Sequence, residues 1–227
     1  MADEPTVATH AIVVPRTARY CTLGPTHGFP RELWFACHGY GQLASRFIRQ
    51  FAPLDDGTRL IVAPEGLSRF YLDPIPKRRN DPSPRIGATW MTREDRESEI
   101  ADYVSYLERV ADEVRHGLTG AAPRIVVLGF SQGTATVCRW LAASAMRADQ
   151  LILWAGTIPP ELDLAPWAER LRGATITLVA GDGDAMVPPS AMTAEAERLS
   201  AAGVAFTIHR HEGEHEITTE GLNSLLG

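Results

Sequence analysis

A serine with a glycine two positions away on each side stands in the middle of the chain, in GFSQG, residues 129–133. The apolar run RIVVLGF precedes it, and the helical pattern SQGTATVCRWLAASAM begins at the serine itself. A tight turn between strand and helix pushes a serine hydroxyl clear of the backbone, and the glycines make room for that turn. The N-terminus of the helix adds a partial positive charge that favours a developing anion. Ser131 is therefore the candidate nucleophile.

A serine hydroxyl is a weak nucleophile that needs a general base, and the base needs an orienting acid. Asp182 and Asp184 follow the apolar run TITLVAG. We take Asp184 as the candidate acid because it precedes the turn that opens the next helical pattern, whereas Asp182 suits a turn-forming role. The stretch HRHEGEHEI after the last predicted strand supplies the base, with His215 as the first choice and His211 as the second.

The letters HEGEH within that stretch also match the H-E-x-x-H pattern of zinc peptidases. Such a site needs both histidines one turn apart on a helix and a third ligand. Here an alternating strand pattern, VAFTIHRH, leads into the motif, and Gly213 in its middle disfavours a helix. Residues 216–227 contain no His or Cys. We therefore expect neither a metal site nor a cofactor.

A developing oxyanion needs two backbone donors. One is expected from Gln132, directly after the nucleophile, and the other from Tyr40 in the loop HGYGQ. His38 should shape this loop. Cys37 ends an apolar run, which favours packing over a nucleophilic role.

Short apolar segments alternate with helical patterns along the chain. The predicted strands are residues 11–14, 19–23, 33–37, 59–63, 125–129, 151–154, 176–180 and 204–209. The middle segments are apolar throughout, which is typical of strands covered by helices on both sides. This order predicts an α/β fold with a mostly parallel central sheet of about eight strands and helices on both faces. The first two strands are joined by only four residues, so we expect an antiparallel hairpin at the edge of the sheet.

Residues 66–90 interrupt this alternation with a segment rich in Pro, Arg and Asp. A loop of this length in a compact domain is usually functional or disordered. Apolar residues in and around it, together with one from the acid loop, are candidate walls of a substrate pocket, although each suits the core equally well. They are Phe70, Tyr71, Trp90, Met91 and Met186.

Length and composition limit the class of protein. With 227 residues, 44% of them hydrophobic, the chain can form one large α/β domain over residues 1–227. The net charge is −6 and the one basic cluster is residues 77–79, which argues against a nucleic-acid partner. No apolar stretch is long enough to span a membrane, and no signal pattern begins the chain. Three scattered cysteines fit a reducing cytoplasm, and a homodimer is left open.

Taken together, HGYGQ, GFSQG, GDGDAMVP and HEI resemble the α/β-hydrolase superfamily, and within it the phospholipase/carboxylesterase family of acyl-protein thioesterases and bacterial carboxylesterases. The resemblance implies an α/β-hydrolase fold without a separate lid domain. It also implies that Ser131, Asp184 and His215 are nucleophile, acid and base. The chain departs from the family pattern at Tyr40, where Leu or Gly is more usual, and at Glu214, where Gly is frequent.

The function that follows is hydrolysis of small carboxylic esters through an acyl-enzyme, with a small-molecule ester as the partner. Thioester, lysophospholipid or peptide cleavage on the same three residues is the first alternative. A non-catalytic binding protein and a zinc peptidase are the others.

Overall fold

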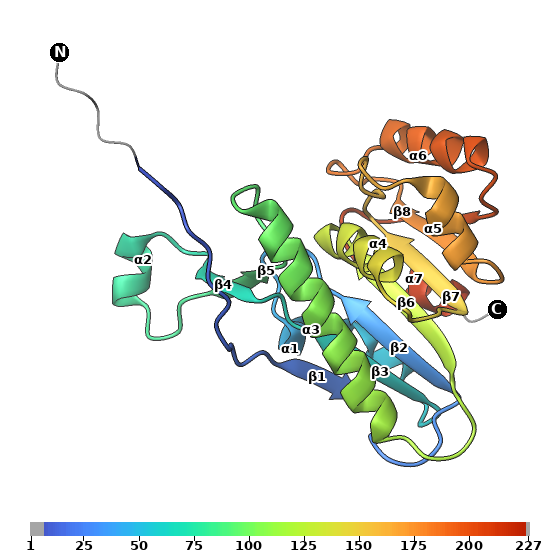
Figure 1. Ribbon diagram of the computed structural model, residues 1–227, viewed down its shortest axis with the longest axis horizontal. Helices are drawn as coiled ribbons and strands as arrows, with labels where there is room; N and C mark the ends of the chain where they lie inside the picture. The colour runs from blue at the N-terminus through green and yellow to red at the C-terminus, as the bar shows by residue number, and fades with distance from the viewer. Residues whose placement is uncertain (1–6, 226–227) are drawn as a thin grey trace.

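A mostly parallel sheet forms the centre of the computed structural model, which describes residues 7–225 except the side chain of Asn80 (Figure 1). Within these residues the sheet has seven strands in the order β1-β3-β2-β6-β7-β8-β9. Among the strand pairs of this seven-stranded sheet, only β1 and β3 are antiparallel. The strands are β1 Tyr20–Leu23, β2 Glu32–Cys37, β3 Arg59–Pro64, β6 Arg124–Phe130, β7 Gln150–Trp154, β8 Thr175–Gly181 and β9 Thr207–His211. The parallel strands therefore all end at one edge, where loops can converge.

Helices cover both faces of this sheet (Figure 1). One face packs against α3 Arg96–His116, α4 Gln132–Ala143, α5 Leu164–Arg170 and α6 Pro189–Ala201. The other face packs against α1 Ala44–Phe47, the 3-10 helix Ile48–Leu54 and α7 Thr219–Ser224. Within residues 155–174, all of them described, only α5 lies between β7 and β8, so this connection holds no lid domain.

Strand β2 shows why the central segments are apolar throughout. Leu33 and Phe35 point into the core beneath α3 and α4, whereas Trp34 and Ala36 point into the core beneath α1 and α7. All four are at most 1% exposed. Because successive side chains of a strand alternate between faces, a sheet covered on both sides buries every position.

The strand predicted at residues 11–14 is wrong. Residues 7–19 form no strand, and Ile12 and Val13 are 86% and 95% exposed. Strand β1 pairs directly with β3, and no neighbouring strand accompanies residues 11–14. Apolar β-branched residues do not make a strand without a partner to complete the hydrogen bonds. The central sheet therefore has seven strands rather than eight, and no edge hairpin.

Residues 66–90 are also more ordered than the predicted loop. They contain β4 Ser68–Tyr71, α2 Ile75–Asn80 and β5 Ile86–Thr89, and β4 pairs with β5 in antiparallel fashion. The buried carboxylate of Asp73 accepts hydrogen bonds from Arg85 and Lys77, which hold its pKa well below the ordinary value. An ion-paired carboxylate thus ties the segment together, and we name residues 66–90 the excursion.

The fold predicts a difference between two positions on α3. Leu107 is fully buried against the sheet, whereas Ser105 is exposed. We expect Leu107→Ala to lower the free energy of unfolding by about 2–5 kcal/mol, because it leaves a cavity. The control Ser105→Ala should change it by less than about 0.5 kcal/mol. Urea unfolding followed by circular dichroism measures both, and equal effects would contradict this packing.

Candidate active site

Ser131 occupies the sharp turn between β6 and α4. Its backbone has φ 54° and ψ −117°, a conformation that L-residues seldom adopt. Close packing leaves no space for side chains at the glycines beside it. A Cβ on Gly133 would lie 2.1 Å from the Cys37 carbonyl oxygen, and one on Gly129 would lie 2.4 Å from the Gly133 carbonyl oxygen. The turn is therefore formed as the GFSQG pattern predicts.

Two further residues hold this turn, and the sequence reasoning missed both. A Cβ on Gly156, after β7, would lie 2.6 Å from the Ser131 carbonyl oxygen. The buried Thr134 hydroxyl donates to the Gly129 carbonyl at 3.0 Å. Gly156 lies outside the motif in sequence, and the one available signal was a glycine directly after an apolar run.

Ser131, His215 and Asp184 meet at the carboxyl edge of the sheet. His215 Nε2 lies 2.9 Å from Ser131 Oγ, and His215 Nδ1 lies 2.8 Å from Asp184 Oδ2. The three residues come from the turn after β6, the loop after β8 and the loop after β9. This is the hydrogen-bonded chain in which an imidazole can take a proton from a hydroxyl while a carboxylate orients the ring.

Asp184 is fixed from two sides. Its Oδ1 accepts the backbone N–H groups of Met186 and Val187 at 2.8 and 2.9 Å, while Oδ2 faces His215. Burial opposes ionisation, but these hydrogen bonds outweigh it and lower the pKa of Asp184 below its ordinary value. Asp182, by contrast, is half exposed and pairs with Arg210 on the surface. The geometry favours Asp184 over Asp182.

The HEGEH stretch is not a helix. Strand β9 ends at His211, α7 begins at Thr219, and residues 212–218 between them form no helix. His211 is buried and packs against Trp154 with ring centroids 5.4 Å apart, whereas His215 is the histidine that bonds Ser131. Among residues 7–225, no group of three His, Cys, Asp or Glu side chains is placed to hold a metal ion.

The loop after β2 lies against Ser131, since a Cβ on Gly39 would be 3.1 Å from the Ser131 Cβ, and most of its backbone N–H groups are already bonded. The Gly39 N–H donates to the Gln42 side chain at 2.8 Å, the Gln42 N–H to the Gly39 carbonyl at 3.2 Å, and the Gly41 N–H to Ala88 at 2.8 Å. This leaves the N–H of Tyr40 as the candidate donor of the loop. Gln132, the first residue of α4, has an N–H without an intrahelical acceptor.

His38 shapes this loop from inside the protein. Its Nε2 accepts the Gly66 N–H at 2.9 Å, so the ring proton must be on Nδ1, which donates to the Gly39 carbonyl at 2.8 Å. Burial lowers the pKa of His38 and keeps the ring neutral. His38 is therefore a structural residue, as the sequence predicts.

The candidate pocket residues separate into two groups. Trp90 is 1% exposed and donates to the His38 carbonyl at 2.8 Å, so it belongs to the core rather than to a pocket wall. Met91 is half-buried, and its carbonyl accepts the Gln132 side chain at 2.9 Å. Thr89, in β5, also bonds this side chain, so the excursion fixes the residue after the nucleophile. No sequence motif predicted this.

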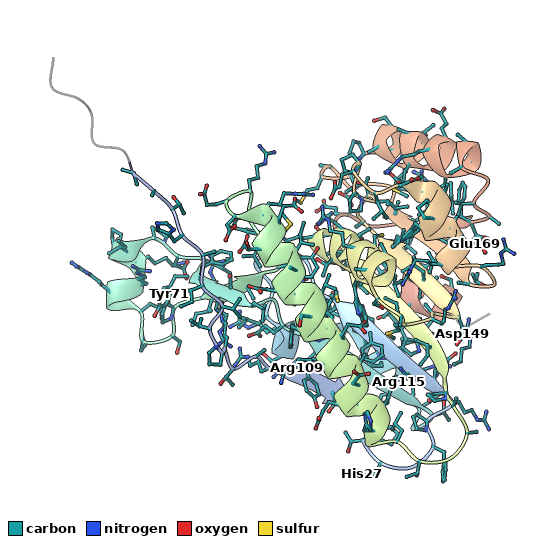
Figure 2. The ribbon with its side chains drawn as sticks, viewed as in Figure 1. His27, Tyr71, Arg109, Arg115, Asp149 and Glu169 are labelled. Carbon is teal, nitrogen blue, oxygen red and sulfur yellow. The ribbon has the colours of Figure 1, made fainter. Side chains whose placement is uncertain are left out.

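The other pocket candidates are Phe70, which is half-buried, and Tyr71 and Met186, which are exposed. Tyr40 is 62% exposed and packs against Phe70 of the excursion at 5.1 Å between ring centroids. Met186, in the loop of Asp184, is 72% exposed. Tyr71 is exposed on the excursion, away from the helices that cover the sheet (Figure 2). The guanidinium of Arg78 lies over its ring, 4.5 Å from the centroid. Phe70 and Met186 thus remain candidates for substrate contacts, and the structure adds Tyr40, which packs beside Phe70.

Cys37 is an unsuitable nucleophile. It is fully buried at the end of β2, and burial raises the pKa of its thiol. A buried, protonated thiol does not attack a substrate.

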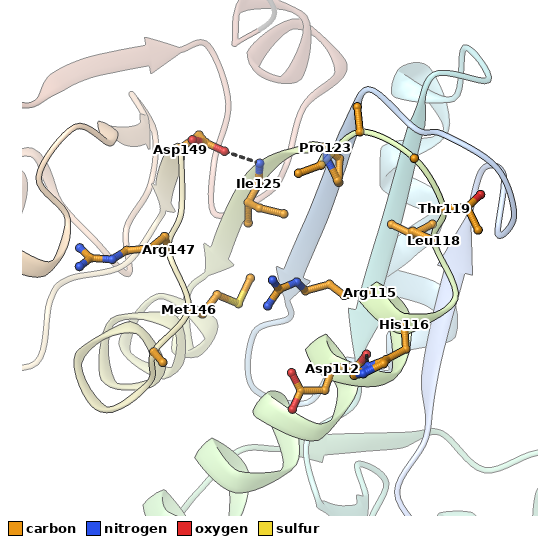
Figure 3. A pocket seen from close by; sticks show the side chains of 14 residues that line it. Asp112, Arg115, His116, Leu118, Thr119, Pro123, Ile125, Met146, Arg147 and Asp149 are labelled. Carbon is orange, nitrogen blue, oxygen red and sulfur yellow. Dashed lines mark hydrogen bonds between the residues drawn. The ribbon is translucent and has the colours of Figure 1, made fainter.

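A hollow of about 620 Å³ lies at the other end of the sheet (Figure 3). It is lined by the end of α3, including Arg115, and by Ile125, whose N–H donates to Asp149 at 2.7 Å. Ile125 begins β6 and Ser131 follows its end, a separation of about 20 Å at the usual rise per residue. This hollow is therefore not part of the site at Ser131.

The family model described as phospholipase/carboxylesterase matches residues 33–226. The chain therefore belongs to the phospholipase/carboxylesterase family, a class of hydrolases with the α/β-hydrolase fold. Among curated proteins the sequence finds no match.

Solved structures share the fold. They include Zea mays acyl-protein thioesterase 2, at 15% identity and a TM-score of 0.66 over 92% of this chain and 96% of that chain. Esterase PE8 has 21% identity and a TM-score of 0.63 over 92% and 95%. A Bacillus cereus carboxylesterase has 15% identity and a TM-score of 0.61 over 92% and 91%. Identities this low establish a common architecture.

Within residues 7–225, no helix combines the length and the apolar character needed to cross a bilayer.

The lowered pKa of Asp184 predicts a pH-dependent stability. An acid whose pKa falls on folding stabilises the protein above its unfolded pKa, about 3.9, and this stabilisation is lost as the pH falls through the folded value. We expect Asp184→Asn to be less stable than the wild type at neutral pH and the difference to shrink between about pH 5 and pH 2. Urea unfolding at several pH values tests this.

Asp182→Asn is the matched control, because its surface ion pair should contribute at most about 1 kcal/mol. A stability difference for Asp184→Asn that does not change with pH would contradict the role of its charge.

Proposed function

We propose that this hydrolase is a serine carboxylesterase that acts through an acyl-enzyme on Ser131. The observation that carries the proposal is the continuous hydrogen-bonded chain from Ser131 through His215 to Asp184, at 2.9 and 2.8 Å. Its location at the carboxyl edge of the sheet, on a strained turn, is the setting in which such a serine is exposed to substrate.

In the proposed reaction, Ser131 Oγ attacks the ester carbonyl while His215 Nε2 accepts its proton. Asp184 holds the Nδ1–H tautomer and stabilises the imidazolium that forms. His215 then protonates the leaving alcohol, and the acyl group stays on Ser131. A water molecule, deprotonated by His215, attacks this acyl-enzyme and releases the acid.

The negative charge on the carbonyl oxygen is stabilised by the backbone N–H groups of Tyr40 and Gln132. Both groups are held rigidly: Gln132 by the bonds of its side chain to Thr89 and Met91, and the Tyr40 loop by Gly41 N–H on Ala88. Donors that are already in place at the start of the reaction stabilise the anion without a reorganisation cost.

Apolar side chains on the loops of the site suit a small or flexible acyl group. Tyr40 and Met186 are exposed on the loops that carry the site, and half-buried Phe70 packs against Tyr40. No lid domain covers them from the β7–β8 connection, which holds α5 alone. Thioester cleavage is the second candidate, because the fold is similar to that of an acyl-protein thioesterase. Oxygen esters and thioesters with the same acyl chain, compared by kcat/KM, distinguish the two substrates.

Replacement of the nucleophile is the direct test. We expect Ser131→Ala to lower kcat on a short p-nitrophenyl ester by at least about 10³-fold, as in other serine enzymes. A fluorophosphonate should label the wild type at Ser131 and leave the variant unlabelled. Ser105→Ala, exposed on α3, is the matched control and should keep full activity. Full activity in Ser131→Ala, or activity abolished by a chelator, would overturn the serine mechanism.

Two substitutions at Tyr40 separate its backbone N–H from its phenol. Tyr40→Phe keeps the N–H and should retain kcat within about threefold, since it removes no donor from the anion. Tyr40→Pro lacks the N–H and should lower kcat by about 10²–10³-fold. Steady-state kinetics, with thermal unfolding to confirm that both variants fold, measure the difference. A large loss in Tyr40→Phe would show that the phenol itself acts.

A further inference from the structure

Trp154 lies between the two segments that carry Ser131 and His215. It is the last residue of β7 and is fully buried. Its backbone carbonyl accepts the N–H of Ser131 at 2.9 Å. Its indole Nε1–H donates to the carbonyl of Glu216, the residue after His215, at 2.9 Å. One residue thus bonds both the turn of the nucleophile and the loop of the base.

Backbone hydrogen bonds hold the loop around His215, beginning with one from the Gly183 N–H to the Gly213 carbonyl at 2.8 Å. The Glu216 N–H donates to the Glu214 carbonyl at 3.0 Å, which closes a tight three-residue turn with His215 at its centre. The carbonyl of the same Glu216 accepts the indole N–H of Trp154. Both bonds of Glu216 fix the backbone immediately after His215. They therefore determine the position of the His215 Cα, from which the imidazole extends.

The indole is itself held in place. The ring of His211 packs against it at 5.4 Å between centroids. On α7, a Cβ on Gly221 would lie 2.6 Å from the Trp154 Cη2 atom, so the helix backbone contacts the ring directly. With both neighbours in contact, the indole N–H cannot reorient without moving α7 or the end of β9. The bond to Glu216 is therefore a fixed constraint.

We propose that Trp154 is a positioning residue that sets the separation of Ser131 and His215. It touches no reacting atom and acts through the Ser131 N–H and the Glu216 carbonyl. The inference rests on the proposed serine mechanism, in which these two side chains must stay 2.9 Å apart. A displacement of about 1 Å in such a pair can cost about 10²-fold in rate.

Two substitutions separate the indole N–H from the bulk of the ring. Trp154→Phe keeps most of the apolar volume and removes the donor. Trp154→His removes the benzene part of the indole but can place a ring N–H near the original Nε1 position. We expect the Phe variant to be the more stable of the two and the less active, with kcat lowered by about 10–100-fold and KM changed by less than about threefold. The His variant should retain more kcat despite a lower melting temperature.

Trp140→Phe is the matched control. Trp140 is also fully buried, and its indole N–H donates to Glu108 at 2.6 Å. It lies in the second half of α4, about two turns away from Ser131. It should lose stability like Trp154→Phe and keep kcat. Each variant is measured well below its melting temperature, with the rate of fluorophosphonate labelling of Ser131 as a second readout. That rate should fall in parallel with kcat in Trp154→Phe.

Two outcomes would overturn the inference. One is a kcat in Trp154→Phe equal to that of Trp140→Phe. The other is a kcat in Trp154→His lower than that in Trp154→Phe, so that activity follows stability rather than the ring N–H. Failure of the proposed function is separate, because it would appear as full activity in Ser131→Ala, whatever the behaviour of the Trp154 variants.

Discussion

The backbone conformation at Ser131 is the constraint on which the rest of the site depends. A φ of 54° in a residue with a side chain costs about 1–3 kcal/mol, so surrounding contacts must hold it. The Ser131 N–H is bonded to the carbonyl of Trp154, and its carbonyl is packed against Gly156. Gly133 brings the first turn of α4 against the end of β2. Neighbouring strands on both sides of β6 therefore hold the turn.

The same packing explains how the other groups reach Ser131. Strand β2 ends beside β6, which brings the loop of Tyr40 to the turn, and the excursion closes over this loop through the Gln42–Ala88 bridge. On the other side, β8 and β9 end next to each other, which brings Asp184 and His215 together. Parallel strands with a common carboxyl edge bring together residues far apart in sequence, and the chemistry is concentrated there.

Several elements could be predicted from the sequence because their signals are local. The GFSQG turn, the buried strands and the alternation with helices depend on residues within a few positions of each other. The strand predicted at residues 11–14 was wrong because a strand requires a partner, and β-propensity does not supply one. The excursion was read as a loop because its order comes from Asp73 and Arg85, an ion pair between residues twelve positions apart.

For the site itself, residue types and their order along the chain determined the candidate nucleophile, acid and base, since few serines, acids and histidines follow strand ends. The sequence favours Asp184 over Asp182 and His215 over His211, but it does not show which contacts each of them makes. Only the tertiary structure shows those contacts: His215 bonds Ser131 and Asp184 bonds His215, while Asp182 pairs with Arg210 and His211 packs on Trp154. The physical reason is that neighbours two or four positions apart in a loop can point in opposite directions. Their orientation is set by contacts with distant strands, which no local pattern contains.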